Sequence, residues 1–277
     1  MLDKFLIKKI IENALAEDIS GGDITSNYLI SEYKKGEGKI TVKEDGVISG
    51  LDVVEMTFKT IDENLAFKKL KKDGDIVKKG DDVAIIKGTL VNILKGERVA
   101  LNFLQRMSGI ASKSRRYAEK VKDLPVRVVD TRKTTPGLRL IEKYSVKVGG
   151  CFNHRYNLSD CVMIKDNHIK SVGGIKEAIK ITRENVPHTI KIEVEVESLR
   201  ELEEALEAKA DIIMLDNMNI DCMKKAIEIN KGRAILEASG NIKEDNIRQI
   251  AELGIDIISV GDLTHSIKSL DISLNII

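Results

Sequence analysis

Polar and small residues follow several short apolar runs in the second half of the chain. Six such runs end in groups that could bind or activate a substrate: Asp130-Thr131-Arg132-Lys133, Lys165-Asp166-Asn167-His168, Glu193 with Glu195 and Glu197, Asp216-Asn217, Glu237-Ala238-Ser239-Gly240, and Ser259-Val260-Gly261. In a βα barrel the carboxyl ends of the strands face the active site. Packing alone does not require polar residues at all of these ends, so the pattern predicts an active site at one rim.

The candidate site is rich in positive charge. Its cationic candidates are Arg132, Lys133, His154, Arg155 and Lys165, and two arginines of a preceding helical segment, Arg98 and Arg106, could join them. Arginine offers a planar fork to a carboxylate or phosphate, while lysine acts as a point charge. So many cations in one cavity would repel one another unless the ligand carries several negative charges. This set predicts a substrate that bears both carboxylates and phosphates.

Acidic and small residues complete the candidate site. Glu195 and Asp216 stand near the ends of neighbouring strands and could hold either Mg²⁺ or the hydroxyls of a ribose, and their spacing leaves both roles open. Ser239-Gly240 and Gly261 open short turns before helices, where backbone N–H groups and a helix dipole favour a phosphate. Glu193, Glu195 and Glu197 alternate by two and therefore share one face of a strand.

The elements that must position these residues alternate between strands and helices. The predicted strands cover residues 126–130, 161–165, 190–196, 211–215, 234–237 and 256–260, and the predicted helices between them cover residues 175–184, 199–208, 221–230 and 242–253. Apolar runs of this kind are typical of parallel strands that are buried on both faces. Six strand–helix units predict a compact βα barrel, with an open doubly wound sheet as the alternative.

The first half of the chain has a different texture. Residues 1–16 have the apolar spacing of a helix, and residues 39–88 alternate short β-rich runs with glycine-bearing turns. Residues 92–121 predict one or two helices, with a break at Gly109. A small β-rich module is therefore expected before the barrel.

The bulk composition excludes several classes of protein. The 277 residues carry 45 Lys+Arg against 44 Asp+Glu, so no global basic excess indicates binding to DNA or RNA. The three cysteines form no CxxC pair, which argues against a disulfide framework and favours a reducing cytoplasm. No apolar run approaches the length of a membrane span, and charges interrupt the N-terminal segment. We expect a cytoplasmic protein with neither a nucleic-acid nor a membrane partner.

Several motifs are similar to one known family. They are EDISGGDITS, ERVALNFLQRMSGIAS, DTRKTTPGLRLIEKYSVKVGG, NHRYNLSD, IKDNHI, EVEVES, IIMLDN, EASGNI and ISVGDLTHS. In this order and spacing they resemble the quinolinate phosphoribosyltransferase family, also called nicotinate-nucleotide pyrophosphorylase (carboxylating). The resemblance runs over essentially the whole chain, and DTRKTTPGLR together with NHR and KDNH is its most specific part.

The resemblance implies a fold and an activity. The fold is an N-terminal α/β sandwich domain over residues 1–108, with residues 267–277 packing back on it, and an incomplete α/β barrel of six or seven strands over residues 109–266. The activity is a decarboxylating pentosyl transfer, in which quinolinate and phosphoribosyl pyrophosphate (PRPP) give nicotinate mononucleotide, pyrophosphate and CO₂ for de novo NAD biosynthesis. Mg²⁺ is the implied cofactor.

The resemblance also assigns roles to individual residues. The quinolinate site is lined by Arg132, His154, Arg155 and Lys165, and Arg98 of the neighbouring subunit completes it. This implies a homodimer, with a hexamer left open. Lys133 lies between quinolinate and the pyrophosphate of PRPP. Glu195, favoured by its family spacing to Asp216, shares with Asp216 the ribose hydroxyls and the associated Mg²⁺. The 5-phosphate is bound by Ser239, Gly240, Gly261 and His265.

Other functions remain open at this point. A related phosphoribosyltransferase could act on another acceptor, such as nicotinate. A βα-barrel aldolase could use Lys165 to form a Schiff base. A catalytically silent barrel could bind phosphate without releasing pyrophosphate. His154, next to Arg155, favours a functional role, whereas His168 is explained at least as well by a structural hydrogen bond.

Overall fold

The computed structural model describes residues 2–277, and the chain groups into two compact units. Unit 1 comprises the chain up to Arg115, residues 134–150 and residues 263–277, and unit 2 comprises residues 116–133 and 151–262. The chain therefore passes between the units several times, and helix α4 (Leu90–Lys120) contributes to both. Within the described residues no helix has the length and apolar character needed to span a membrane.

Unit 1 is built on an antiparallel sheet. Its strands follow the order β12 (Ile272–Ile276), β1 (Lys35–Val42), β5 (Asp82–Thr89) and β3 (Ala66–Lys69), while β2 (Gly46–Val47) and β4 (Ile76–Val77) form a separate pair. The C-terminal strand thus pairs with the first strand of the chain, Ile40 lying opposite Leu274. Both side chains are buried in the core of this unit.

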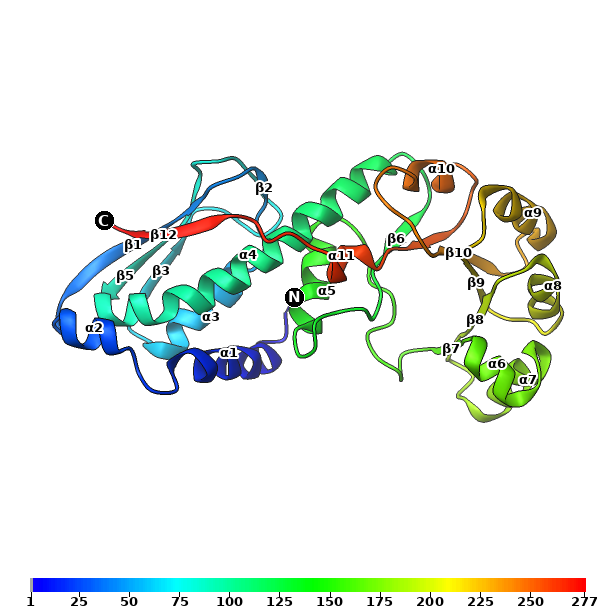
Figure 1. Cartoon of the computed structure of the whole chain (residues 1–277), viewed down its shortest axis with the longest axis horizontal. Coiled ribbons are helices and arrows are strands. Elements are labelled where there is room, and N and C mark those ends of the chain that lie inside the picture. Colours follow the sequence, from blue (N-terminus) through cyan, green and yellow to red (C-terminus); the bar gives the residue numbers. More distant parts are fainter. Residues whose placement is uncertain (1) are drawn as a thin grey trace. The chain divides into compact units, whose positions relative to one another are not determined.

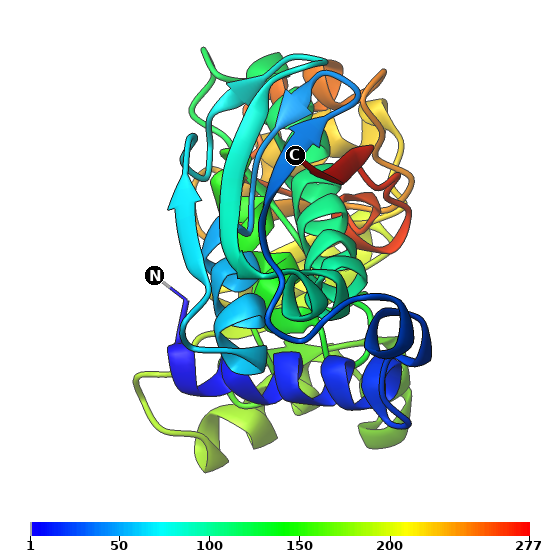
Figure 2. The same ribbon diagram turned by 90° about the vertical axis from the view of Figure 1, so that its left-hand side faces the viewer.

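Unit 1 also contains several helices. Besides α4 they are α1 (Lys4–Ile19), α2 (Ile24–Leu29), α3 (Leu51–Ile61) and α5 (Arg139–Val148). The predicted first helix is confirmed as α1: Asp3 caps it by accepting the N–H of Phe5 at 2.9 Å. Its buried residues Ile7 and Ile11 are one turn apart, and α1 packs against α3 (Figure 2).

Helix α3 lies in a segment that was expected to be β-rich, and that expectation is wrong over residues 51–61. Leu51, Val54 and Phe58 recur at helical spacing, and all three are buried in the core of unit 1. Short β-rich runs on both sides hid this periodicity in the sequence. Because of this helix, unit 1 is an α/β sandwich and not the β-rich module that was expected.

Helix α4 continues through Gly109, so the expected break at this glycine is wrong. A Cβ atom at Gly109 would lie 2.3 Å from the carbonyl oxygen of Lys268 and 3.1 Å from the Cα of Ser269. Gly109 is therefore needed for the close approach of another backbone segment and does not interrupt the helix. In a sequence, a glycine can mark either a helix break or a close backbone approach. The sequence alone could not show that residues 268–269 approach Gly109.

We expect Gly109→Ala to lower the free energy of unfolding by about 1–3 kcal/mol, because a backbone carbonyl must move to accept the methyl group. Urea denaturation measures the change. Gly21→Ala is the control, since a Cβ there would meet nothing within 4 Å. Equal stability of the two variants would contradict the packing role of Gly109.

Unit 2 is built on a six-stranded parallel sheet. Its order is β6 (Arg127–Val129), β11 (Ile257–Ser259), β10 (Ile235–Ser239), β9 (Ile212–Asp216), β8 (Ile192–Val196) and β7 (Val162–Ile164). The six predicted strands are confirmed within two residues at each end. The first and last strands of the order, β6 and β7, are the edges of the sheet, so the described strands form an incomplete barrel.

Helices connect successive strands of unit 2. They are α6 (Asp166–Val172), α7 (Ile175–Asn185), α8 (Leu199–Glu207), α9 (Ile220–Asn230) and α10 (Ile247–Ala251). The short helix α11 (Asp262–His265) follows β11, where the chain passes from unit 2 back to unit 1. In Figure 1, α7, α8 and α9 lie outside the sheet. The predicted helix over residues 242–253 is shorter than expected: Asn246 accepts the N–H of Lys243 at 2.8 Å and holds the preceding residues in a turn.

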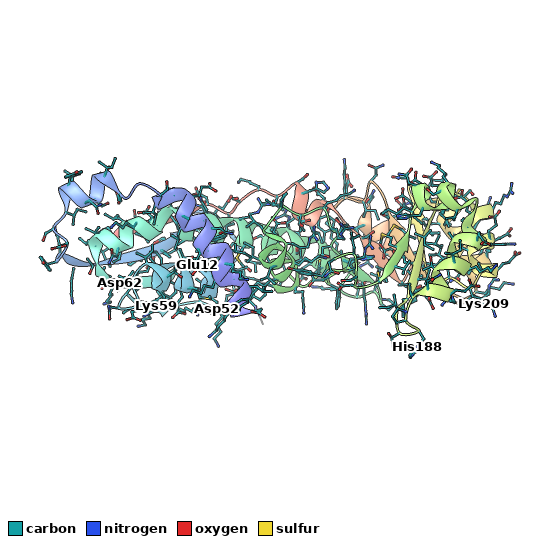
Figure 3. The ribbon with its side chains drawn as sticks, turned by 90° about the horizontal axis from the view of Figure 1, so that it is seen from below. Glu12, Asp52, Lys59, Asp62, His188 and Lys209 are labelled. Carbon is teal, nitrogen blue, oxygen red and sulfur yellow. The ribbon has the colours of Figure 1, made fainter. Side chains whose placement is uncertain are left out.

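Charged side chains of both signs cover the exterior, in keeping with the near-zero net charge. Glu12 and Lys59 of unit 1 and Lys209 of unit 2 are exposed examples (Figure 3). The remaining histidine, His188, is exposed in the segment between α7 and β8. It belongs to the amino-terminal side of β8, away from the carboxyl ends where the candidate site was expected.

Candidate active site

The strand register places the predicted site residues of unit 2 at one edge of the parallel sheet. Ile164 is paired with Val194, so Lys165 and Glu195 follow at the same level on neighbouring strands. Farther along the sheet, Asp216 is paired with Ser239. Because all strands are parallel, these residues lie at the carboxyl ends, where the sequence predicted them.

Lys165 and Glu195 form an ion pair between adjacent strands. The Lys165 ammonium donates to Oε2 of Glu195, whose side chain is only 14% exposed. The backbone N–H of Lys165 donates to Nδ1 of His168 at 3.0 Å. His168 therefore fixes the backbone at the beginning of α6, which agrees with the structural interpretation of this histidine.

His154 lies between two buried glutamates. Its Nε2 is 3.2 Å from Oε2 of Glu237 on β10 and 3.4 Å from Oε2 of Glu193 on β8, and both glutamate side chains are 1% exposed. The backbone of His154 is also held, since its N–H donates to Asp130 at the end of β6 at 2.9 Å. One histidine thus connects three strands at the floor of the candidate site.

This cluster retains a proton near neutral pH. Burial by itself would lower the pKa of His154, but hydrogen bonds to Glu193 and Glu237 and the charges of both raise it to about 10. Burial raises the pKa of Glu193 as well. The N–H of Arg155 donates to Nδ1 of His154 at 2.7 Å, so the ring proton lies on Nε2, facing the carboxylates. Because Nδ1 accepts a hydrogen bond, a further proton on the cluster lies on one of the two buried carboxylates, in keeping with the raised pKa of Glu193.

His154, Glu193 and Glu237 are also close enough to share a metal ion, because their possible ligand atoms lie within 4.8 Å of one another. A histidine nitrogen binds a metal through its lone pair. Here Nε2 points its proton at the carboxylates, so the three residues form a hydrogen-bonded cluster. Mg²⁺ prefers oxygen ligands in octahedral geometry, which this cluster does not offer.

Arg155 is fixed beside His154. Its Nη1 donates to the carbonyl oxygen of Cys161 at 3.3 Å and its Nη2 lies 3.4 Å from the sulfur of Met163. Its buried Nε has no hydrogen-bond partner among residues 2–277. A buried donor of this kind is costly without an acceptor and suits a carboxylate ligand.

The carboxylates of Glu195 and Asp216 are each bonded through one oxygen. Glu195 uses Oε2 for Lys165, and Asp216 uses Oδ2 to accept the side-chain N–H of Asn217 at 2.8 Å. The second oxygen of each side chain makes no hydrogen bond within residues 2–277 and could take a ligand. Carboxylates that combine with substrate phosphates and water are typical ligands of Mg²⁺.

Arg106 is not available as a substrate-binding cation. Its Nε and Nη2 donate to Oε1 of the fully buried Glu142 at 2.8 and 2.6 Å, and Nη2 also donates to the hydroxyl of Thr135 at 2.6 Å. Glu142 accepts the backbone N–H of Thr135 through its other oxygen at 3.1 Å. Arg106 thus stabilises the segment that follows Lys133, and the suggestion that it joins the cationic set is wrong.

The other predicted residues are distributed over both units. Arg132 and Lys133 follow β6, and Gly261 follows β11, all in unit 2. Arg98 and His265 belong to unit 1: Arg98 is exposed on α4, and His265 in α11 contacts the hydroxyl of Ser266 at 2.6 Å. Within unit 2 the structure brings Lys165 into contact with Glu195. It separately brings His154 into contact with Glu193 and Glu237.

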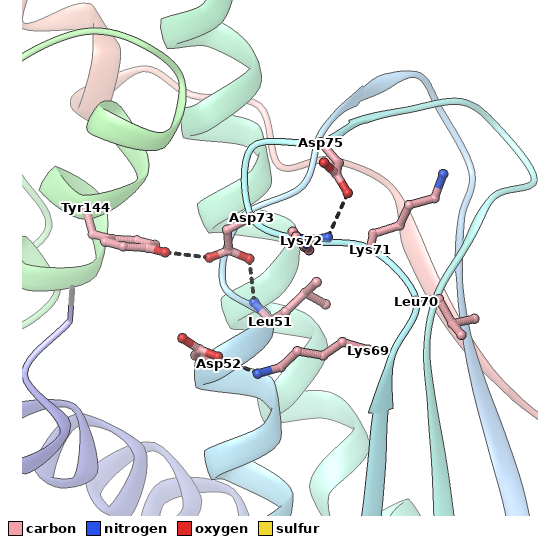
Figure 4. A pocket seen from close by; sticks show the side chains of 9 residues that line it. All are labelled: Leu51, Asp52, Lys69, Leu70, Lys71, Lys72, Asp73, Asp75 and Tyr144. Atoms are coloured by element: carbon pink, nitrogen blue, oxygen red, sulfur yellow. Dashed lines mark hydrogen bonds and ion pairs between the residues drawn. The ribbon is translucent and has the colours of Figure 1, made fainter.

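A separate pocket in unit 1 contains none of the predicted site residues among those that line it (Figure 4). Several of its charged side chains are paired within the protein. Asp73 accepts the N–H of Gly50 and of Leu51 at 2.8 and 3.0 Å and the hydroxyl of Tyr144 at 2.9 Å, and Lys69 pairs with Asp52. Asp73 in this pocket holds the beginning of α3 through these backbone bonds. The pocket is therefore not a candidate active site.

The incomplete barrel and the charged carboxyl edge of its sheet define an enzyme that handles an anionic substrate. Residues 110–275 match the family model described as quinolinate phosphoribosyl transferase, C-terminal domain, and residues 23–108 match the N-terminal domain of the same family. Together these matches cover most of the chain. The protein belongs to the quinolinate phosphoribosyltransferase family.

Individual relatives agree with this assignment. A probable nicotinate-nucleotide pyrophosphorylase [carboxylating] of Methanocaldococcus jannaschii is 45% identical over 97% of this chain and 96% of its own length. The corresponding protein of Bacillus subtilis is 42% identical over 98% of this chain and 93% of its own length. The crystal structure of NadC from Streptococcus pyogenes has a TM-score of 0.95 at 45% identity and covers 100% of this chain and 99% of that one.

Proposed function

We propose that this enzyme transfers the phosphoribosyl group of PRPP to quinolinate, with decarboxylation, and so makes nicotinate mononucleotide, pyrophosphate and CO₂ for NAD biosynthesis. The observation that carries the proposal is the common carboxyl edge of the parallel sheet: Lys165 and Glu195 follow the paired residues Ile164 and Val194, and the paired residues Asp216 and Ser239 end their strands at the same edge. Cations suited to carboxylates lie next to acids suited to a sugar and a turn suited to a phosphate. The family relationship supports the same reaction.

Quinolinate carries two carboxylates, and the proposed subsite has matching donors. Arg132, His154, Arg155 and Lys165 would line it, and the buried Nε of Arg155 is a donor that a carboxylate would satisfy. The proton held between His154 and its glutamates keeps the negative charge of the floor below that of two free carboxylates. An anionic ring can therefore lie above this floor.

PRPP would occupy the adjoining part of the edge. Glu195 and Asp216 would bind the ribose hydroxyls and share a Mg²⁺ ion, which would neutralise charge on the leaving pyrophosphate. Lys133 would contact that pyrophosphate. Ser239, Gly240, Gly261 and His265 would bind the 5-phosphate, and the left-handed φ of Gly240, +90°, turns the backbone directly after β10.

The chemistry needs positioning and electrostatics more than covalent catalysis. The bond between C1 of the ribose and pyrophosphate breaks, while the pyridine nitrogen forms the new bond to C1 from the opposite face. Glu195 or Asp216 would offset positive charge that develops on the sugar. The cationic ring nitrogen then stabilises the carbanion left at C2 when CO₂ departs, and a proton from Lys133 or from water adds to C2.

We also propose a cytoplasmic homodimer in which Arg98 completes the quinolinate site of the neighbouring subunit. Support comes from the exposure of Arg98 on α4 and from its place in the motif ERVALNFLQR. The hexamer remains an alternative assembly of the same dimers. The free state of all three cysteines is compatible with a reducing compartment.

A comparison of two acceptors tests the proposed substrate. With PRPP and Mg²⁺ present, quinolinate should be consumed, whereas nicotinate, which lacks the 2-carboxylate, should be used at least about 100-fold less efficiently, because a site built to bind both carboxylates is left with unpaired donors. Liquid chromatography of nicotinate mononucleotide measures both reactions. Turnover of nicotinate but not of quinolinate would overturn the proposal.

A further inference from the structure

Asn217 has a left-handed backbone conformation directly after Asp216. Its φ is +53°, in the left-handed region that few residues other than glycine adopt. The other non-glycine residues with positive φ among residues 2–277 are Lys209, Lys231 and Asn241. Lys209 and Lys231 end helices α8 and α9, where such a conformation is common. Asn217 and Asn241 instead flank the residues proposed to bind PRPP.

The side chain of Asn217 connects two parts of that site. Its Nδ2 donates to Oδ2 of Asp216 at 2.8 Å, and its Oδ1 accepts the Nδ2–H of Asn241 at 3.2 Å. Its backbone N–H donates to the carbonyl oxygen of Ser239 at 3.0 Å. One asparagine therefore bonds to the acid that ends β9 and to both sides of the turn at the end of β10.

Gly240 and Asn217 fit closely against each other. A Cβ atom at Gly240 would lie 2.2 Å from Oδ1 and 2.9 Å from the backbone N of Asn217. Gly240 is thus required by its own φ of +90° and also by the position of the asparagine. The turn and Asn217 therefore pack closely against each other.

We infer that Asn217 is a positioning residue that fixes Asp216 relative to the Ser239–Gly240 turn, and so sets the separation at which the ribose and the 5-phosphate of PRPP are bound. The inference rests on the proposed function, which assigns Asp216 to the ribose and the turn to the phosphate. Asn217 itself acts through these neighbours. Its short polar side chain tolerates the left-handed backbone and supplies both a donor and an acceptor.

The test replaces Asn217 by glycine, which tolerates the same φ and removes both side-chain bonds. We expect the KM for PRPP to rise by about tenfold or more, with the KM for quinolinate changed less than about twofold, because the defect lies in PRPP alignment. Asn185→Gly is the matched control. This exposed asparagine is the last residue of α7, on the amino-terminal side of the sheet, and its side chain donates to the carbonyl oxygen of Ile181 in the same helix. It should leave both KM values unchanged.

A double-mutant cycle adds a readout that a purely structural role would not give. Gly240→Ala should raise the KM for PRPP strongly in the wild-type background and by a smaller factor in Asn217→Gly, where Oδ1 no longer blocks the new methyl group. An unchanged KM for PRPP in Asn217→Gly, an equal rise in both KM values, or additive effects in the cycle would each overturn the inference. Failure of the wild-type enzyme to turn over PRPP and quinolinate would instead overturn the proposed function.

Discussion

Lys165→Ala is expected to lower kcat/KM for quinolinate by about 100-fold or more. The substitution removes a cation proposed to bind a substrate carboxylate and also removes the partner of Glu195. Loss of one preorganised donor aimed at developing charge typically reduces the rate by about 10²–10³-fold. Lys165→Arg should recover only part of the activity, because the planar guanidinium cannot reproduce the position of the ammonium between β7 and β8.

Lys170→Ala is the control for this prediction. Lys170 lies one turn along α6, is exposed, and pairs with Asp166 at 3.1 Å. Steady-state kinetics of the two variants should therefore differ by two orders of magnitude. Full activity of Lys165→Ala would contradict the assigned role. Trapping of a substrate on Lys165 by borohydride would favour the Schiff-base aldolase instead.

Glu142→Ala is expected to lower the free energy of unfolding by about 3–5 kcal/mol, the range for removing one partner of a buried ion pair. The side chain of Glu142 is fully buried and accepts hydrogen bonds from Arg106 and from the backbone N–H of Thr135. Its loss leaves the Arg106 guanidinium, 27% exposed, without its carboxylate. Urea denaturation of the purified variant measures the change.

Two comparisons make this stability prediction specific. Glu244→Ala breaks an ion pair with the 56% exposed Arg116 and should cost less than about 1 kcal/mol. The double variant Arg106→Ala/Glu142→Ala should be more stable than the sum of the single effects implies, because it leaves no unpaired buried charge. A change below about 1 kcal/mol in Glu142→Ala would show that the pair does not stabilise this fold.

The strands and their functional ends could be predicted because their signals are local. Most strands of unit 2 are short apolar runs, and the residues at or just after their ends, such as Asp216 and Lys165, are polar where parallel strands share an edge. Strand period placed Glu193 and Glu195 on one face. The sequence could not show that Glu193 is buried against His154 while Glu195 pairs with Lys165, since both contacts depend on register between distant segments.

Errors arose where a long-range contact determines the role of a residue. Arg106 looked like a substrate cation, but its partner Glu142 lies 36 positions away. Gly109 looked like a helix break because the approaching carbonyl of Lys268 is far along the chain. Asn217 was noticed only as part of a strand end, and its left-handed backbone and its bonds to Asp216 and Asn241 are visible only in three dimensions.

The central claim is that one edge of the barrel sheet joins a doubly carboxylated pyridine to a phosphorylated ribose and then removes one carboxylate as CO₂. The most direct measurement supplies the purified protein with PRPP, Mg²⁺ and quinolinate labelled in its 2-carboxylate, and follows labelled CO₂, pyrophosphate and nicotinate mononucleotide together. The three products should form in equal amounts and only when both substrates are present. Pyrophosphate release without labelled CO₂, or no product at all from folded protein, would contradict the account.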